Sequence, residues 1–323
     1  MSLLRVAVIY GGPSLEHEVS LKTGKEMLAG LNKELYDITP VLITKEGLWK
    51  INKSSLLTQD KAINELKKYI DVCMIGLHGA FGEDGQIQLL LEKMKLSFTG
   101  SGSKSSKLAM EKHLASMQFS NNGLNTPKEL VINAWSDSLM SAVEKKLDMP
   151  IVVKPQSQGS SVGVSIVSDI AKLNTAVKTA LTKDSVVLLQ QFIKGREVSC
   201  GVLDVNGELL ALPPTEVEPI NSEFYDYDAK YDIGATKETT PPRNMGKTTI
   251  KIIQEIALKA HNILGCSGYS RTDIIISENS PFIIETNTLP GMTATSFLPQ
   301  QIAAIGMSFP ELLDNIINSA LRK

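Results

Sequence analysis

The sequence has little cysteine, histidine or tryptophan, and none of these residues forms a metal-binding pattern. Its three cysteines, Cys73, Cys200 and Cys266, are odd in number and lie far apart, so a disulfide framework is excluded. We expect all three to be reduced in a cytoplasmic protein. Cys73 lies in an apolar run, which predicts a buried thiol.

The sequence also lacks an excess of charge of one sign and a long apolar segment. The net charge is −2 over 323 residues, and basic and aromatic residues do not alternate as they do in proteins that stack bases. The apolar run at residues 4–10 is too short to cross a membrane and has no cleavage pattern, which predicts a strand. We therefore expect neither a nucleic-acid nor a membrane partner.

The patterns that are present predict three domains of α/β and α+β type. In residues 1–100, apolar strands alternate with amphipathic helices, which is typical of a parallel sheet. The strands are expected at 4–10, 38–43 and 72–77, and the helices at 20–30 and 84–94. A glycine and serine cluster at 99–103 marks the end of this domain.

Residues 101–185 predict a small α+β domain, and residues 186–323 predict a third domain. Helices are expected at 105–117 and 136–147, and strands at 129–132, 151–154, 162–167 and 186–193. Asn206 and Gly207 separate two strands and are the strongest short hairpin pattern. Residues 221–245 form a polar stretch that is long enough to be a functional lid. Residues 308–311 predict a capping box that opens the last helix.

A hairpin of carboxylates carries the clearest chemistry. Two β-branched runs flank a polar turn near residue 279, and a symmetric turn would place Asp273 opposite Glu285 and Arg271 opposite Asn287. Carboxylates ~5 Å apart repel by ~3 kcal/mol at an effective dielectric constant near 20. A cation must therefore lie between them, or one of them must be protonated.

Two interpretations of this hairpin remain open from the residues alone. Carboxylate and amide oxygens favour Mg²⁺ over Zn²⁺, and such sites are completed by substrate phosphates. Alternatively, Arg271 neutralises Asp273 and Glu285 in a plain cluster of ion pairs.

Other polar elements are ambiguous when taken singly. The loop at 154–163 could hold an anion on its backbone N–H groups or be an ordinary hairpin loop, and it is no P-loop. Lys112 and Glu197 could be surface residues, and we expect His17 to be one. His78 opens a glycine-rich turn at the carboxyl end of a strand, where α/β sheets bind ligands. The turn after the first strand lacks GxGxxG and no acidic residue ends the second strand, so a nicotinamide-binding domain fits poorly.

Taken together, six segments resemble D-alanine–D-alanine ligases, in the family's order and over almost the whole chain. They are residues 10–20, 77–85, 99–102, 153–163, 224–231 and 285–293. The resemblance implies a three-domain ATP-grasp fold whose N-terminal domain holds the parallel sheet. It further implies a cytoplasmic enzyme, usually a homodimer, that joins two D-alanine molecules for peptidoglycan precursors through an acyl phosphate. The implied enzyme requires ATP and two magnesium ions, for which Mn²⁺ could substitute. The resemblance does not decide whether a monovalent cation also binds.

The resemblance also implies residue roles. Catalysis would involve Glu16, Ser160, Tyr231, Arg271 and Gly291: Glu16 would anchor the first ammonium, Ser160 and Tyr231 would bond to Glu16, and Arg271 and the Gly291 N–H would bind the oxyanion. The expected ATP-binding residues are Lys112, Lys154, Gln190, Gln191, Ile193, Glu197, Phe224 and Lys230. The expected substrate-binding residues are His78, Ser296 and Phe297. The expected metal ligands are Asp273, Glu285 and Asn287.

One position departs from the family, which usually has Glu and then Lys where this chain has Gln190 and Gln191. The amide of Gln190 can still accept a hydrogen bond from the adenine amino group, but without charge assistance. On sequence alone, Gln190→Glu is therefore expected to tighten ATP binding.

Three alternatives accompany this resemblance. A ligase of the same fold could make D-alanyl-D-lactate or D-alanyl-D-serine, although lactate-forming relatives lack Tyr231. Another ATP-grasp carboxylate–amine ligase fits less well, because Glu16 and Tyr231 belong to the first family. A catalytically silent nucleotide-binding protein would not need the intact set of Arg271 and metal ligands.

Overall fold

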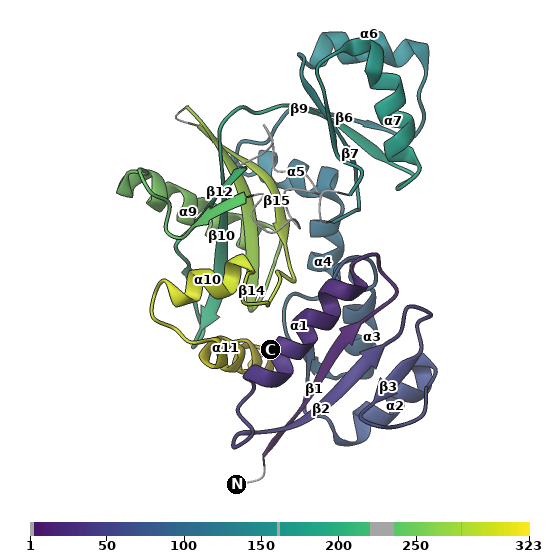
Figure 1. The fold of residues 1–323 in the computed structure, drawn as a ribbon, viewed down its shortest axis with the longest axis vertical. Helices are drawn as coiled ribbons and strands as arrows, with labels where there is room; N and C mark the ends of the chain where they lie inside the picture. The colour runs from purple at the N-terminus through teal and green to yellow at the C-terminus, as the bar shows by residue number, and fades with distance from the viewer. Residues whose placement is uncertain (1–2, 160–161, 220–235, 279) are drawn as a thin grey trace.

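The computed structural model describes residues 3–159, 162–219, 236–278 and 280–323 (Figure 1). These residues form three sheets, one parallel in most of its pairings and two antiparallel. Among them, no helix is both long and apolar enough to pass through a lipid bilayer.

The first domain is built on a sheet in the order β3-β2-β1-β4-β5, in which only β2 and β3 pair in antiparallel fashion. Residues 6–9 of β1 are fully buried, as expected for a strand covered on both faces. The predicted parallel sheet is therefore confirmed. The elements are β1 (Leu4–Gly11), α1 (His17–Gly30), β2 (Tyr36–Ile43), β3 (Trp49–Ile51), α2 (Gln59–Tyr69), β4 (Val72–Ile75), α3 (Gln86–Met94) and β5 (Ser97–Phe98).

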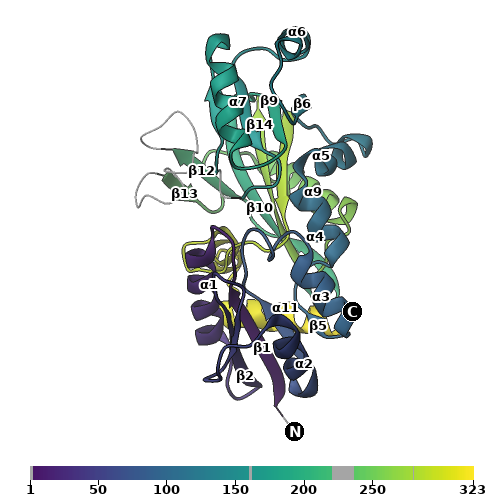
Figure 2. The same ribbon diagram turned by 90° about the vertical axis from the view of Figure 1, so that its right-hand side faces the viewer.

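Two helices lead from this domain toward the second one (Figures 1 and 2). They are α4 (Ser103–Met110) and α5 (Lys112–Asn121). The prediction of a single helix at 105–117 was wrong, because Glu111 between them has φ −79° and ψ 80°. Apolar periodicity does not reveal one non-helical ψ angle. The break makes Lys112 the first residue of α5.

The second domain is a four-stranded antiparallel sheet in the order β6-β9-β7-β8. Its elements are β6 (Glu129–Ile132), α6 (Asp137–Lys146), β7 (Ile151–Pro155), β8 (Ser165–Val167), the 3₁₀ helix η1 (Ile170–Lys172), α7 (Leu173–Leu181) and β9 (Val187–Gln191). The boundary expected at residue 186 therefore falls one strand too early. Strand pairing between distant segments assigns β9 to this sheet, and no local pattern could have shown it.

Successive side chains of β7 point to opposite faces of this sheet, so one set is buried in the core and the other faces outward. Ile151 and Val153 are fully buried in the core with residues of α6 and α7. Val152 and Lys154 therefore point to the opposite face, and both line a cleft toward the third domain.

The third domain contains an antiparallel sheet in the order β13-β12-β10-β14-β15, with β11 paired to β10. Its elements are β10 (Arg196–Val205), β11 (Glu208–Ala211), β12 (Thr215–Pro219), β13 (Thr236–Thr239), α9 (Lys247–Ile263), β14 (Tyr269–Ser277), β15 (Ser280–Asn287), α10 (Phe297–Ala303) and α11 (Phe309–Leu321). The hairpin at Asn206 and Gly207 is confirmed, and both have positive φ. Strand β13 lies within residues 221–245, so this part of the expected loop is a strand.

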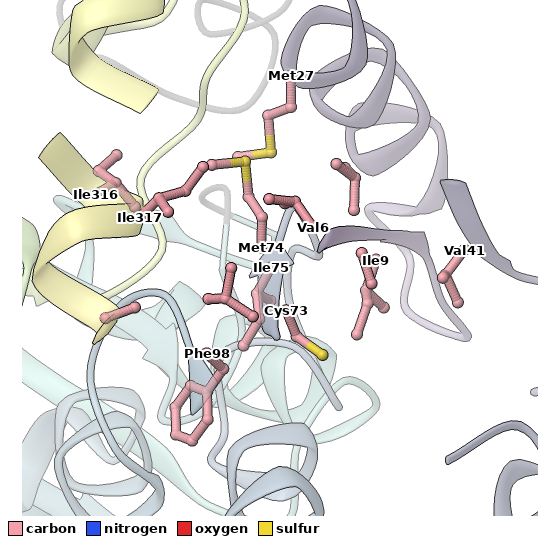
Figure 3. Close-up of a cluster of buried hydrophobic side chains, with 14 of the residues drawn as sticks. Val6, Ile9, Met27, Val41, Cys73, Met74, Ile75, Phe98, Ile316 and Ile317 are labelled. Atoms are coloured by element: carbon pink, nitrogen blue, oxygen red, sulfur yellow. The ribbon is translucent and has the colours of Figure 1, made fainter. Parts of the chain in front are cut away.

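The C-terminal helix returns to the first domain. The predicted capping box between Ser308 and Glu311 opens α11 and is confirmed. Ile316 and Ile317 lie beside Met74 in the core of the first domain (Figure 3). Because one apolar core includes both ends of the chain, the first and third domains are packed together.

Candidate active site

Two cavities meet at Lys112 and Glu285, which line both of them. The larger has a volume of about 1210 Å³ and lies between the sheets of the second and third domains. The smaller, of about 430 Å³, is lined by the first domain together with β15 and the start of α10. The larger cavity, here called the cleft, and the smaller one, here called the chamber, therefore share one polar junction.

The hairpin of β14 and β15 positions the acidic residues at this junction. Asp273 pairs with Glu285 and Arg271 pairs with Asn287, as predicted. The turn itself pairs Ser277 with Ser280, a register one residue out from the symmetric one. A β-bulge next to Asp273 corrects this offset. The predicted pairing is right, but it depends on a β-bulge that was not expected from a symmetric turn.

Two cations neutralise the two carboxylates. Arg271 donates to Asp273 from Nε at 3.0 Å and from Nη2 at 2.8 Å, and Ser199 donates to the same carboxylate at 2.5 Å. Lys112 Nζ lies 3.4 Å from Glu285 Oε2. The ion pair with Arg271 therefore neutralises Asp273, while Lys112 on α5 neutralises Glu285.

The same residues fit a hard divalent cation. Within the described ranges, no three His, Cys, Asp or Glu residues gather as a metal site. The hairpin instead presents two carboxylates and the amide of Asn287, whose Oδ1 accepts a hydrogen bond from the Leu289 N–H at 2.8 Å. A magnesium ion needs only one or two protein carboxylates when substrate phosphates complete its shell. The donor set therefore suits Mg²⁺ together with a phosphate-bearing ligand.

Two lysines bring positive charge to the junction. Lys112 donates to the Gln158 carbonyl at 2.7 Å, which joins α5 to the glycine-rich loop. Lys154 is 5% exposed. Burial lowers the pKa of Lys154 to about 8, and the charge of nearby Glu285 opposes that shift. A buried lysine beside an open cleft is well placed to receive an anion.

Four expected nucleotide-binding residues all line the larger cavity: Gln190 and Gln191 on β9, Ile193 between the two strands, and Glu197 on β10. Gln190 is only 4% exposed. Its Nε2 donates to Glu129 Oε2 at 3.0 Å, and Glu129 Oε1 lies 2.8 Å from His113 Nδ1. Sequence reasoning missed Glu129, because it belongs to no motif and meets Gln190 only through the pairing of β6 with β9.

Glu16 and His78 line the smaller cavity from the first domain. A Cβ atom at either Gly79 or Gly159 would lie 2.8 Å from Glu16 Oε2, so these two glycines make room for this carboxylate. His78 is buried, with Nε2 2.8 Å from the Thr23 hydroxyl and Nδ1 3.3 Å from Glu83. The prediction that His17 is a surface residue was wrong. It is buried, and its Nδ1 bonds to the Gly12 carbonyl.

The far wall of the smaller cavity carries hydrogen-bond donors and an aromatic ring. The guanidinium of Arg271 lies 5.5 Å from the centre of the Phe297 ring. Gly291 approaches Ser296 closely, since an added Cβ would lie 2.6 Å from Ser296 Oγ. Glu238 on β13 also lines this cavity and accepts a hydrogen bond from Gln300 at 2.5 Å, and burial raises its pKa. It was missed because residues 221–245 were interpreted as a loop.

Four expected site residues lie outside the described part of the chain: Ser160, Phe224, Lys230 and Tyr231. The other expected residues line one or both cavities. All three cysteines are free, and burial raises the pKa of Cys73 to about 12.

Comparison with known proteins gives one consistent family. Residues 5–101 match the family model described as "D-ala D-ala ligase N-terminus", and residues 119–318 match "D-ala D-ala ligase C-terminus". A relative named D-alanine--D-alanine ligase from Syntrophobacter fumaroxidans is 43% identical over 319 residues, covering 98% of each chain. One of the same name from Anaeromyxobacter sp. (strain K) is 38% identical, over 99% of this chain and 97% of the relative.

Two solved structures are similar over the whole chain. The D-Ala:D-Ser ligase VanG from Enterococcus faecalis superposes with a TM-score of 0.87 at 30% identity, covering 99% of this chain and 100% of that one. The D-alanine--D-alanine ligase from Bacillus anthracis complexed with ATP gives a TM-score of 0.83 at 32% identity, covering 99% and 98%.

Proposed function

Because this chain belongs to the D-alanine–D-alanine ligase family, we propose that it joins two D-alanine molecules at the expense of ATP. Its fold is the three-domain ATP-grasp fold of that family. The observation that carries the proposal is the meeting of the two cavities at Lys112 and Glu285. A phosphate donor in the cleft and an amino acid in the chamber would have their reacting groups at this junction.

The first step transfers the γ-phosphoryl group of ATP to the carboxylate of the first D-alanine. Glu16 would hold the ammonium group of that substrate by charge. Lys112 and Lys154 would hold the transferring phosphates, while Gln190 and Glu197 would bind the adenine and the ribose. Asp273, Glu285 and Asn287 would hold magnesium, which when bound supplies positive charge to the phosphates. The products of this step are ADP and a D-alanyl phosphate.

In the second step, the amine of the second D-alanine attacks the acyl carbon. The C–N bond forms, the C–O bond to phosphate breaks, and the proton that the amine loses is taken up by the departing phosphate. Arg271 and the Gly291 N–H would donate to the oxyanion, a contribution of ~3–4 kcal/mol per donor. Ser296 and the backbone of Phe297 would hold the second carboxylate.

The test is release of phosphate from ATP and Mg²⁺ with D-alanine, L-alanine, D-lactate or D-serine as substrates. D-alanine should support release and yield a dipeptide visible by mass spectrometry. A folded sample that binds ATP but releases no phosphate with D-alanine would disprove this function.

A second candidate is a ligase that places D-serine in the second site. It is favoured by the likeness to a D-Ala:D-Ser ligase and by Glu238, a polar group that lines the smaller cavity. Competition between D-alanine and D-serine in one reaction distinguishes the two, because the ratio of dipeptides measures the preference directly.

We further propose a cytoplasmic homodimer that serves peptidoglycan precursor synthesis, as the resemblance implies. Light scattering of the purified protein tests the dimer. A mass of one chain, about 35.1 kDa, would contradict it.

A further inference from the structure

The amide of Gln190 is held by a residue that has no part in the functions described above. Glu129 on β6 lies opposite Gln190 on β9 in the register of the antiparallel pair. Its carboxylate accepts from Gln190 Nε2 at 3.0 Å through Oε2 and lies 2.8 Å from His113 Nδ1 through Oε1. The side chain of Glu129 is 8% exposed, so water competes little for these bonds.

The chemistry of a carboxylate decides how this amide is oriented. An ionised carboxylate only accepts hydrogen bonds, whereas an amide has a donating NH₂ and an accepting carbonyl. Turning the Gln190 amide over would bring two acceptors together beside Glu129 in a buried place. Glu129 therefore keeps the NH₂ group on its own side, and the carbonyl is the group left for the cleft that Gln190 lines.

We infer that Glu129, supported by His113, is a positioning residue that makes Gln190 an acceptor only and so selects a 6-amino purine nucleotide. The amino group of adenine donates to such a carbonyl. A 6-oxo purine presents a second acceptor at that position and is rejected. This inference rests on the proposed function, since it takes the cleft to be the nucleotide site.

This device differs from a glutamate at position 190, which could only accept. A glutamine without a fixed neighbour could turn over and donate to a 6-oxo group, so it would discriminate poorly. When it is paired with Glu129, the Gln190 amide presents only a hydrogen-bond acceptor to the nucleotide, as a carboxylate would.

The test compares binding of ATP and inosine triphosphate to the full chain by calorimetry. Inosine triphosphate carries a carbonyl where ATP carries its amino group. In Glu129→Gln, the new amide can either accept from or donate to Gln190, so Gln190 can turn over. The dissociation constant of inosine triphosphate divided by that of ATP should fall roughly 10-fold. Discrimination of this kind comes from buried polar groups that the wrong ligand leaves unpaired. Glu144→Gln, an exposed site on α6 with the same change of charge, should leave the ratio unaltered.

A purely structural role for Glu129 would weaken both nucleotides alike and leave their ratio unchanged. That result, with ATP still bound by the wild type, overturns this inference alone. A wild type that binds no ATP overturns the proposed function and this inference with it. Gln190→Met removes the carbonyl and keeps much of the shape, and it should lower the ratio as far as Glu129→Gln does. An unchanged ratio in that variant would also overturn the inference, even if Glu129→Gln did not fold.

Discussion

Arg271 and Asp273 form a two-pronged ion pair on one face of β14, with N–O distances of 3.0 and 2.8 Å. Arg271 also lies over the Phe297 ring, so it spans the acidic hairpin and the smaller cavity, which both residues line. This pairing holds the Asp273 carboxylate in place. It also means that an arriving cation shares that carboxylate with Arg271 or displaces it.

Asp273→Asn separates the metal role of this residue from its ion-pair role. The variant keeps the shape but loses the charge that a magnesium ion needs, so kcat should fall roughly 100-fold or more. Loss of the Arg271–Asp273 ion pair should cost about 1–3 kcal/mol of unfolding free energy. Initial rates across a magnesium titration and a denaturant melt measure the two effects.

The exposed Asp148→Asn serves as the control for that variant and should change neither quantity. Near-normal turnover per folded molecule in Asp273→Asn would support the plain ion-pair interpretation and contradict the metal site.

The lowered pKa of Lys154 predicts how ATP affinity depends on pH. Burial lowers its pKa from 10.5 to about 8 in the folded chain. Between those values the unfolded chain binds the extra proton, so the contribution of Lys154 to unfolding free energy rises with pH through this window. Phosphates prefer the charged lysine, so ATP affinity should fall as the pH rises above about 8. Lys154→Arg stays charged, and its calorimetric affinity should lose that break; a break of equal size in both proteins would refute the assignment.

Gly159→Ala tests whether Glu16 holds the first substrate. The added Cβ would lie 2.8 Å from Glu16 Oε2 and must displace that carboxylate. Gly159 does not have a positive φ, so alanine fits the backbone. We expect KM for D-alanine at the first site to rise roughly 10-fold or more, since small misplacements are costly at such sites, while ATP affinity stays constant.

Gly246→Ala is the matched control, because its Cβ would meet nothing within 4 Å. In steady-state kinetics, KM for D-alanine should be the same in this variant as in the wild type. An equal rise of KM in both variants would mean that Gly159→Ala acts through general destabilisation.

Gln190→Glu illustrates how the structure changes a prediction made from sequence. The new carboxylate would face Glu129 at about the present 3.0 Å, where two charges repel by ~5 kcal/mol at an effective dielectric constant near 20. One of them would take up a proton instead. The single variant should therefore gain no ATP affinity, contrary to the expectation from sequence alone.

The double variant Glu129→Gln with Gln190→Glu should bind ATP roughly 5- to 10-fold more tightly than the wild type, because the adenine amino group then meets a charged acceptor. Calorimetry on both proteins measures the difference. Tighter binding in the single variant would show that Glu129 does not constrain position 190.

Much of the fold followed from short-range patterns in the sequence. The apolar run of β1 predicted a buried parallel strand, Asn206 and Gly207 predicted a hairpin, and Ser308 with Glu311 predicted a helix start. Each pattern lies within a few residues, where backbone sterics and local hydrogen bonds decide the conformation. The pairing of Asp273 with Glu285 belongs here too, although a bulge was needed to produce it.

The tertiary structure alone decided which distant groups meet. The sequence determined the family, through six ordered motifs, and the types of residue that carry the chemistry. It could not determine that Glu129 meets Gln190, that Lys112 meets Glu285, or that α11 completes the core of the first domain. These contacts depend on strand order, on a helix break at Glu111 and on domain packing. Each is set by the burial of surfaces far apart in the chain, which no local window contains.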